Sequence, residues 1–539
     1  MLKKISVWAG RVALGLVALV VLGYLVENVR GRMAWEQCRR EWAARGVNIE
    51  DWKSVVPAPV PDEDNIAMTP IFQELFAEER AERKRMTESM QALVSSTISN
   101  KGDVAAASAS LKIKSEVPVK KRLRLPYVRA ATNSIPGSAW QAGKSTESLD
   151  PWRVALSNDN LLAALAVYED DLREIEAALK RPSFRYEGWD ALNSSPAMDL
   201  TLIPSKLIRI YQLRAWAKYD EGQYREALED VMTGFRIANL DQDSPSSVSV
   251  LIRSVTLTWM CATLWRGINE QAWDAHQLSA IQEMLQTINL PEHVVKANQF
   301  DNRHFANVAR FEPFWFFCNW MFSPFGVLDV SEATYFYKIA FGLIPSGFFY
   351  QSAVYRVKNF EQINTAIHAD ERWFDLAEIK RMEAALKKGF PGHRMLSMDI
   401  TDCYSNQTKR HASTQATIHQ AVLACAIERH RLAHGRVPRQ LDELVPAYLA
   451  NIPCDPCDGK PMRYKVVGDS DYVLYSIGVN GVDDGGELAL KGSYQKQVDI
   501  DEGDWIWRSC PAEENKEEEV KVDPPSRRRA APLSHGTLP

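Results

Sequence analysis

Residues 426–487 read AIERHRLAHGRVPRQLDELVPAYLANIPCDPCDGKPMRYKVVGDSDYVLYSIGVNGVDDGGE, and residues 498–507 read VDIDEGDWIW. The first stretch opens as a helix, and Gly435 is the type of residue that commonly ends one. A short proline-capped helix follows, then apolar segments suited to strands, then a loop crowded with Gly, Asn and Asp. This order predicts a compact unit that combines helix and sheet near the end of a long chain.

The strands of this unit are signalled by their composition. Residues 462–467 and 472–477 are rich in β-branched and aromatic side chains and flank a Gly-Asp-Ser turn, so they predict a β-hairpin. Residues 505–507 predict a third strand. We therefore expect a small α+β domain with an antiparallel sheet over residues 405–510.

This order of elements resembles the soluble head of the major pseudopilin of type II secretion systems. The resemblance covers the helix ended by Gly435, the tight turn of Asp455-Pro456 and Gly459-Lys460-Pro461, the hairpin and the glycine-rich loop. It implies an assembly and calcium-binding module rather than an enzyme. It also implies that most of the chain lies on the periplasmic side of a bacterial inner membrane.

The loop at 478–487 carries the expected metal site. Calcium takes six to eight oxygen ligands and is often held by flexible, carboxylate-rich loops, and the pseudopilin loop binds calcium at this place. The resemblance implies four side-chain ligands: Asn480, Asp483, Asp484 and Asp499. Asn480 stands where the family has an aspartate, and the segment 486–499 is longer than the corresponding segment of the family. The alternative is an Asp/Gly turn cluster without a metal.

Two further pairs of residues in this region have metal-binding or redox spacing. His430 and His434 lie one helical turn apart, which can place two imidazoles on one metal. The family has a packing tyrosine at position 430, so we expect packing. Cys454 and Cys457 form a CDPC motif, but no second CxxC and no βαβ pattern accompany it. We expect these cysteines to be incidental or to form a local disulfide.

The N-terminus, residues 1–30, predicts a membrane anchor. Ile5 to Val26 is a predominantly apolar run of 22 residues, which is long enough to span a bilayer. A cleaved signal peptide is the alternative, but no small-x-small cleavage site follows the run. We therefore expect an uncleaved single-pass anchor. Basic residues flank both ends of the run, so the positive-inside rule assigns no orientation.

The N-terminus also departs from true pseudopilins. Their mature chains begin with Phe and carry Glu at the fifth position, whereas residues 10–15 of this chain contain neither. We therefore expect that a prepilin peptidase does not process this chain. Outside the head, the chain resembles uncharacterised bacterial membrane-anchored helical proteins.

Residues 31–400 predict a large helical domain, because their apolar residues recur mostly at helical spacing. Residues 207–240 resemble a tetratricopeptide-like helical hairpin that turns at Gly222. Residues 250–285 are spaced for a second hairpin. No 34-residue period repeats, however, so we expect an irregular helical bundle rather than a solenoid.

Three other segments have distinctive compositions. Residues 95–150 lack periodicity and predict a loop or an insertion. Residues 310–350 are dense in aromatics, which indicates either a hydrophobic groove for lipid or a partner, or the core of the helical domain. Interrupting charges argue against a membrane span here and favour the core. Residues 511–539 are charged and rich in proline, so we expect a disordered tail.

Composition and motifs argue against several classes of function. A net charge of −5 offers no general attraction to nucleic acid, and eight cysteines in 539 residues imply no dense disulfide framework. Residues 136–146, PGSAWQAGKST, imitate a phosphate-binding loop, but five residues separate two glycines between which the motif places four. Neither GxSxG nor HExxH occurs.

We therefore predict a mainly α, non-enzymatic, membrane-anchored envelope protein with a binding or scaffolding role linked to secretion or surface assembly. Its expected partners are the membrane and other envelope proteins, with calcium as the cofactor and no nucleic acid. The alternative is an envelope enzyme with its site in the helical domain. The candidate catalytic residues for that alternative are Glu187, Asp190 and His304, which belong to no recognised catalytic motif.

Overall fold

The computed structural model describes residues 2–79, 81, 162, 165–186, 202–311, 344–387, 400–468, 470–491 and 497–509. Several predicted features lie outside these residues: the segment 95–150 with its phosphate-loop-like motif, Glu187, Asp190, residues 312–343 of the aromatic segment, and the tail 511–539.

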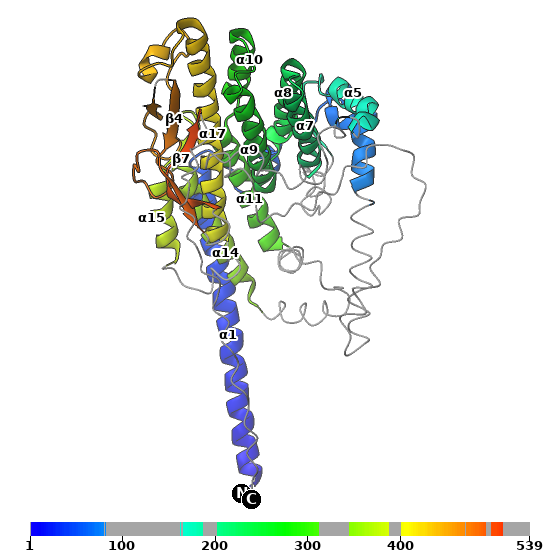
Figure 1. The fold of residues 1–539 in the computed structure, drawn as a ribbon. Coiled ribbons are helices and arrows are strands. Elements are labelled where there is room, and N and C mark those ends of the chain that lie inside the picture. Colours follow the sequence, from blue (N-terminus) through cyan, green and yellow to red (C-terminus); the bar gives the residue numbers. More distant parts are fainter. Residues whose placement is uncertain are drawn as a thin grey trace, which may run out of the picture.

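α1 (Leu2–Ala43) is one helix whose two halves have different surroundings. Its apolar first half projects from the body, and Leu16 there is 59% exposed (Figure 1). Its second half buries Trp35 and Cys38 in a cluster shared with α14 (Ser346–Asn364). The predicted apolar N-terminal helix is confirmed, with a length and composition that suit a membrane anchor or a signal sequence.

The body is built mainly from helices, as predicted. Besides α14, these are α5 (Glu169–Ala178), α7 (Leu202–Asp220), α8 (Tyr224–Ala238), α9 (Ser247–Asn269), α10 (Ala275–Gln286), α11 (Leu290–Phe311), α15 (Leu376–Lys387) and α17 (Ile400–His434). Single 3₁₀ turns are η1 (Lys53–Val55), η2 (Asp62–Asp64), η3 (Ile66–Met68), η6 (Ala166–Tyr168), η7 (Leu240–Asp243) and η8 (Leu441–Leu444). α9 is also apolar enough to cross a membrane, but over half of its apolar window is buried in the body, as in a core helix.

α7 and α8 form a helical hairpin at the position where the sequence resembles one. Gly222 joins them with a φ of 72°, a conformation that glycine adopts without steric cost. Ala227 on α8 is fully buried. The buried carboxylate of Asp230 on α8 pairs with Lys218 on α7 at 2.7 Å. α9 packs against both helices, so the hairpin is one layer of a larger bundle.

The strands that the structure describes form three small antiparallel sheets, whereas the sequence predicted one antiparallel sheet, within residues 405–510. The strands are β1 (Ile367–His368), β2 (Trp373–Phe374), β3 (Arg463–Val467), β4 (Asp471–Ser476), β5 (Leu488–Lys491), β6 (Gln497–Gly503) and β7 (Trp505–Arg508). They pair as β1-β2, β3-β4-β7 and β5-β6. The β5-β6 hairpin was not predicted, because Asp and Glu, which are uncommon in strands, make up much of β6.

α17 lies at the centre of the body and is covered on several sides. It packs against α9 and α10 on one side and against β4 and β7 on the other (Figure 1). Residues 421–427 are accordingly all buried, as expected for a helix without a solvent face. One hydrophobic cluster therefore includes side chains from both predicted domains, such as Leu257 of α9 and Trp507 of β7.

Candidate functional site

The glycine-rich loop, residues 478–487, joins β4 to β5 and brings three of the predicted metal ligands together. The side-chain oxygens of Asn480 and Asp483 each accept a hydrogen bond from the backbone N–H two residues further along, at 3.0 Å. The amide of Asn480 also donates to Asp484 Oδ2 at 3.2 Å. Asp483 and Asp484 are exposed. The loop thus presents two carboxylates on a backbone that its own side chains hold in place.

Asp504 supports this loop, although the sequence analysis did not single it out. Its side chain is 1% exposed, and its carboxylate accepts hydrogen bonds from the backbone N–H groups of Gly486 (2.7 Å) and Asp484 (3.4 Å). Burial raises the pKa of Asp504, and the nearby carboxylates of Asp484 and Asp483 raise it further. A cation beside the loop would relieve this repulsion.

Asp455 fixes the other end of the loop. It is fully buried in the turn before β3, and its carboxylate accepts from Ser476 Oγ (2.6 Å), the backbone N–H of Ile477 (3.0 Å) and Arg463 Nη1 (2.6 Å). Arg463 also lies 3.5 Å from the carboxylate of Asp483. The turn, the end of β4 and the loop are therefore connected by one network of polar contacts.

The structure places Asp499 in β6 (Gln497–Gly503) and not in the loop that holds the other three predicted ligands. Asp499 lies in β6, where Gly503 pairs with Leu488 at the end of the loop. The carboxylate of Asp499 accepts from the backbone N–H of Asp501 at 3.1 Å. Among the residues that the structure describes, no three His, Cys, Asp or Glu side chains are grouped to hold a metal ion.

His430 and His434 lie with ring centroids 4.3 Å apart, but their surroundings favour packing. His430 is 3% exposed, and its Nδ1 lies 3.1 Å from the carbonyl oxygen of Arg436. Its ring also packs edge-on against Tyr448 at 5.8 Å. Burial lowers the pKa of His430, which keeps the imidazole neutral at physiological pH.

Cys454 and Cys457 are both free thiols that contact different partners. Cys454 Sγ donates to the carbonyl oxygen of Glu371 at 3.0 Å, whereas Cys457 Sγ lies 3.4 Å from Ser476 Oγ, whose proton goes to Asp455. Burial raises the pKa of Cys454 to about 11. A redox-active cysteine needs a lowered pKa, so this pair lacks the chemistry of a thioredoxin-like site.

The helical body contains a buried polar cluster that bears on the enzyme alternative. Arg253 is 3% exposed and donates from Nη2 to Asn239 Oδ1 at 2.8 Å, while its Nη1 lies 3.2 Å from His293 Nδ1. The other ring nitrogen of His293 donates to the carbonyl oxygen of Ser244 at 2.8 Å. Both nitrogens of this histidine are therefore engaged, and burial and Arg253 lower its pKa, so the ring is neutral.

A second buried histidine contacts a serine without the arrangement of a catalytic pair. Ser254 Oγ lies 2.8 Å from His411 Nδ1 and donates to the carbonyl oxygen of Val250 at 2.8 Å. Since the hydroxyl proton goes to Val250, His411 acts as the donor to Ser254. Burial lowers the pKa of His411 to about 3. The serine is therefore not activated as a nucleophile, which requires an adjacent base that accepts its proton.

His304 is the one enzyme candidate among the described residues. Its ring packs against two aromatic rings, with centroids 5.9 Å from Trp52 and 5.5 Å from Phe300. This environment is that of a packing residue in the contact between α11 and η1.

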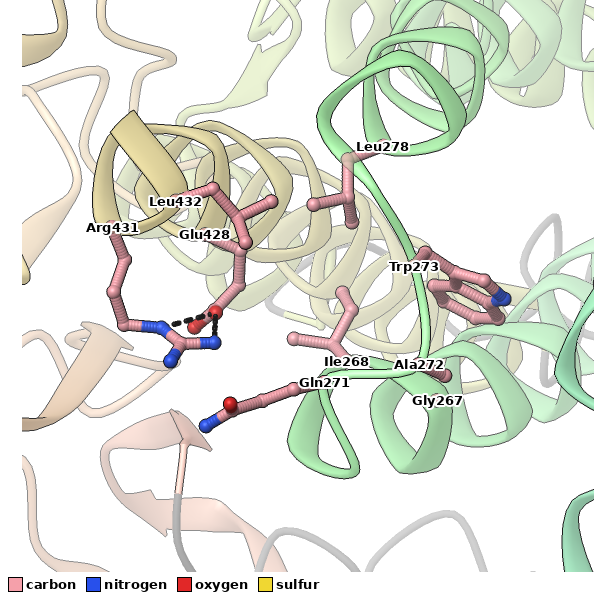
Figure 2. Close-up of a pocket in the computed structure, with 9 residues that line it drawn as sticks. All are labelled: Gly267, Ile268, Gln271, Ala272, Trp273, Leu278, Glu428, Arg431 and Leu432. Carbon is pink, nitrogen blue, oxygen red and sulfur yellow. Dashed lines mark hydrogen bonds and ion pairs between the residues drawn. The ribbon is translucent and has the colours of Figure 1, made fainter. Parts of the chain in front are cut away.

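A shallow hollow lies between the end of α9, the start of α10 and the end of α17 (Figure 2). Its wall is mostly apolar, and the charged groups in it are Glu428 and Arg431, which pair with each other. Gln271 at its rim has a φ of 53°, because the chain turns through the left-handed region just after the end of α9. Because the Glu428 carboxylate is paired with Arg431, the hollow offers neither a free base nor a free acid for catalysis.

No protein family, curated protein or solved structure matches this chain. Function must therefore be inferred from the arrangement of the described residues. Two residues organise the loop: Asp455 was identified from sequence only as part of a tight turn, and Asp504 was not singled out. Asp455 lies in CDPCD and Asp504 in DIDEGD, and nothing in the sequence distinguishes the buried aspartate from the other acidic residues of each stretch.

Proposed function

We propose that this chain is a single-pass, membrane-anchored bacterial envelope protein with a binding or scaffolding role, and that its body is held directly at the bilayer surface. The observation that carries the proposal is the continuity of α1. Its apolar, exposed half and its buried half form one helix without a linker. A protein built in this way presents a rigid body to partners at a fixed distance from the membrane.

The same helix argues against a cleaved signal peptide. Removal of the apolar run would cut α1 close to Glu27 and Asn28, both of which contact α14. A signal peptide is normally a separable segment that the mature fold does not use. We therefore infer that the run is retained as the anchor.

A binding role is favoured over catalysis by the state of the polar groups. The buried histidines His293 and His411 are neutral and hydrogen-bonded, and the carboxylate in the hollow is paired. The carboxylates of Asp483 and Asp484 in the glycine-rich loop are exposed to solvent, although Asp483 also lies 3.5 Å from Arg463. The pseudopilin resemblance suggests the periplasm, secretion or surface assembly as the setting.

Reporter fusion tests the anchor and the orientation. A phosphatase that is active only in the periplasm, fused after Arg508 in the full chain, should be active. Mass spectrometry of the purified membrane protein should detect the intact N-terminus. Activity of a cytoplasmic reporter alone would reverse the orientation, and a mature chain that starts near Glu27 would remove the anchor.

We also propose, as a second candidate function, that the glycine-rich loop binds calcium. The specific observation is that the loop carries the exposed carboxylates of Asp483 and Asp484, and that the buried carboxylate of Asp504 accepts from the backbone N–H groups of Asp484 and Gly486 in the same loop. Asn480 adds a side-chain oxygen, and the remaining predicted ligand, Asp499, lies in β6. Extracellular calcium modules bind with dissociation constants of about 0.1 to 1 mM.

Thermal melting tests calcium binding. At roughly 1 mM calcium, mass action adds about 0.4 to 1.4 kcal/mol to the free energy of unfolding. The full chain in detergent should therefore melt a few degrees higher in calcium than in chelator, and magnesium should have no such effect. Asp483→Ala with Asp484→Ala should abolish the difference, whereas Asp442→Ala, at an exposed position in η8, should preserve it. Identical curves in calcium and chelator would leave the loop as a turn.

A further inference from the structure

The first turn of α14 contacts α1 just beyond its apolar run. Asn28 Oδ1 accepts hydrogen bonds from the backbone N–H of Gly347 (2.9 Å) and from Ser346 Oγ (3.0 Å), which satisfies donors at the start of α14. One turn further along α1, Gly31 lies against the backbone of Gly347. The two helices run parallel from this point, since Glu41 pairs with Lys358 at 2.8 Å.

These contacts fix the depth of α14 relative to a bilayer. A helix rises about 1.5 Å per residue, so Asn28 and Gly31 lie about 3 and 8 Å beyond Val26, the end of the apolar run. The hydrocarbon core is about 30 Å thick and the whole bilayer about 40 to 45 Å, which leaves roughly 5 to 8 Å of headgroups on each side. The first turn of α14 therefore falls within the headgroup layer, and tilting of α1 would bring it closer to the hydrocarbon.

The surface at this level has the composition of a lipid contact. On the side of α1 that faces away from α14, Val29 is 57% exposed and Met33 is 68% exposed, so the apolar stripe continues past the end of the run. Arg30, between them, is exposed. Arg32 is exposed as well. Arg30 forms a loose ion pair with Glu27, at 3.6 Å. Apolar and basic side chains in alternation suit the boundary between lipid chains and phosphates.

We propose that the body carries a second membrane contact, formed by the first turn of α14 together with Val29, Arg30, Arg32 and Met33 of α1, which sits in the headgroup layer and binds the phosphates of anionic lipids. The inference rests on the proposed function of α1 as the anchor. It adds that the body is seated in the membrane surface rather than raised above it.

Site-specific photocrosslinking in nanodiscs tests this contact. The full chain is placed in bilayers of phosphatidylglycerol and phosphatidylcholine, with p-benzoylphenylalanine at one position at a time, and lipid adducts are detected by mass spectrometry. Pro345 reports on the start of α14 and Met33 on the exposed face of α1. Val17 reports on the anchor itself. His276 is the control, because it is exposed on α10. The label of α10 in Figure 1 lies toward the end of the body opposite the projecting half of α1.

The contact predicts lipid adducts at Val17, Met33 and Pro345 and none at His276. Adducts at Val17 without adducts at Met33 or Pro345 would overturn the contact and leave the anchor intact. Absence of adducts at Val17 as well would overturn both. Equal yields at His276 and Pro345 would show that the labelling is unrelated to depth, which also counts against the contact.

Two substitutions test the role of the arginines. With Arg30→Gln and Arg32→Gln, the excess of phosphatidylglycerol over phosphatidylcholine among the Met33 adducts should fall. The expected decrease is up to about fivefold for each arginine, the factor that corresponds to about 1 kcal/mol per basic residue near an anionic surface. Arg39→Gln, about two turns further from the membrane, is the matched control. An unchanged lipid ratio would overturn the phosphate contact.

Discussion

At the scale of single residues, Asp241 is the most poorly satisfied charge among those described. It lies in η7, is 3% exposed, and neither carboxylate oxygen has a hydrogen-bond partner. Burial raises the pKa of Asp241 to about 7, and Arg253 offsets only part of this effect. The carboxyl group is therefore neutral in mildly acidic solution and charged, at a cost, in alkaline solution.

Asp241→Asn should remove this cost. Because the folded-state pKa lies above that of the unfolded chain, Asp241 contributes stability that is fully present below about pH 4 and is lost as the pH rises through 7. The unfolding free energy of the Asp241→Asn variant, relative to that of the parent chain, should therefore increase between pH 4 and 7 and then level off. Denaturant unfolding of the full chain at pH 5, 6.5 and 8 measures this difference.

The matched control is Asp243→Asn, which changes an exposed carboxylate in the same turn. The unfolding free energy of the Asp243→Asn variant, relative to that of the parent chain, should not increase comparably with pH. A constant difference between the Asp241→Asn variant and the parent across this range would mean that Asp241 is hydrated or paired in solution.

At the scale of elements, the contact between α1 and α14 depends on two glycines. A methyl group at Gly31 would overlap the backbone of Gly347, and one at Gly347 would overlap Glu27 and Asn28. This close approach allows the backbone of α14 to meet Asn28. Packing without side chains at the crossing is common where helices meet in or near a membrane.

Gly31→Val should therefore force the two helices apart. The overpacking should lower the unfolding free energy by about 1 to 3 kcal/mol or more, since backbone rather than a flexible side chain stands in the way. Thermal or denaturant unfolding in detergent measures the change. Gly23→Val is the control on the same helix, because nothing lies within 4 Å of that position. Equal stability of the two variants would show that α1 and α14 are not packed as described.

At the scale of the whole molecule, the head and the helical body share one core. α17 is buried by α9 and α10 on one side and by β4 and β7 on the other, and Trp265 of α9 donates from Nε1 to the carbonyl oxygen of Arg508 at 2.7 Å. Gln415 and His419 of α17 further connect the start of α11 to the CDPC turn. Side chains of the two predicted domains therefore pack directly against each other.

Residues 405–510 expressed alone should fail to fold cooperatively, because one face of α17 would exchange its apolar partners for water. Near-ultraviolet circular dichroism and binding of a hydrophobic dye should report a loosely packed state. A chain of residues 27–539 is the control, since it removes only the apolar run and keeps both sides of α17 covered. A sharp melting transition of the excised head at the temperature of the full chain would contradict the shared core.

Local patterns in the sequence were sufficient for the coarse architecture. The apolar run of α1, the helical spacing of the body, the turn at Gly222 and the strands β3 and β4 all follow from interactions between residues near one another in the chain. β6 was missed because its acidic residues are unusual in strands, and the roles of Asp455 and Asp504 were missed because their partners lie 18 to 22 residues away.

The sequence by itself determined that this chain has an apolar N-terminal helix, a mainly α body and a small antiparallel sheet with an acidic, glycine-rich loop. Only the tertiary structure decided that α17 unites body and sheet, that Asn28 meets α14 at the end of the apolar run, and that Asp504 accepts hydrogen bonds from the backbone of the glycine-rich loop. The reason is physical. Periodicity and turn chemistry are set by neighbouring residues, whereas burial, depth and the convergence of side chains depend on how distant segments pack.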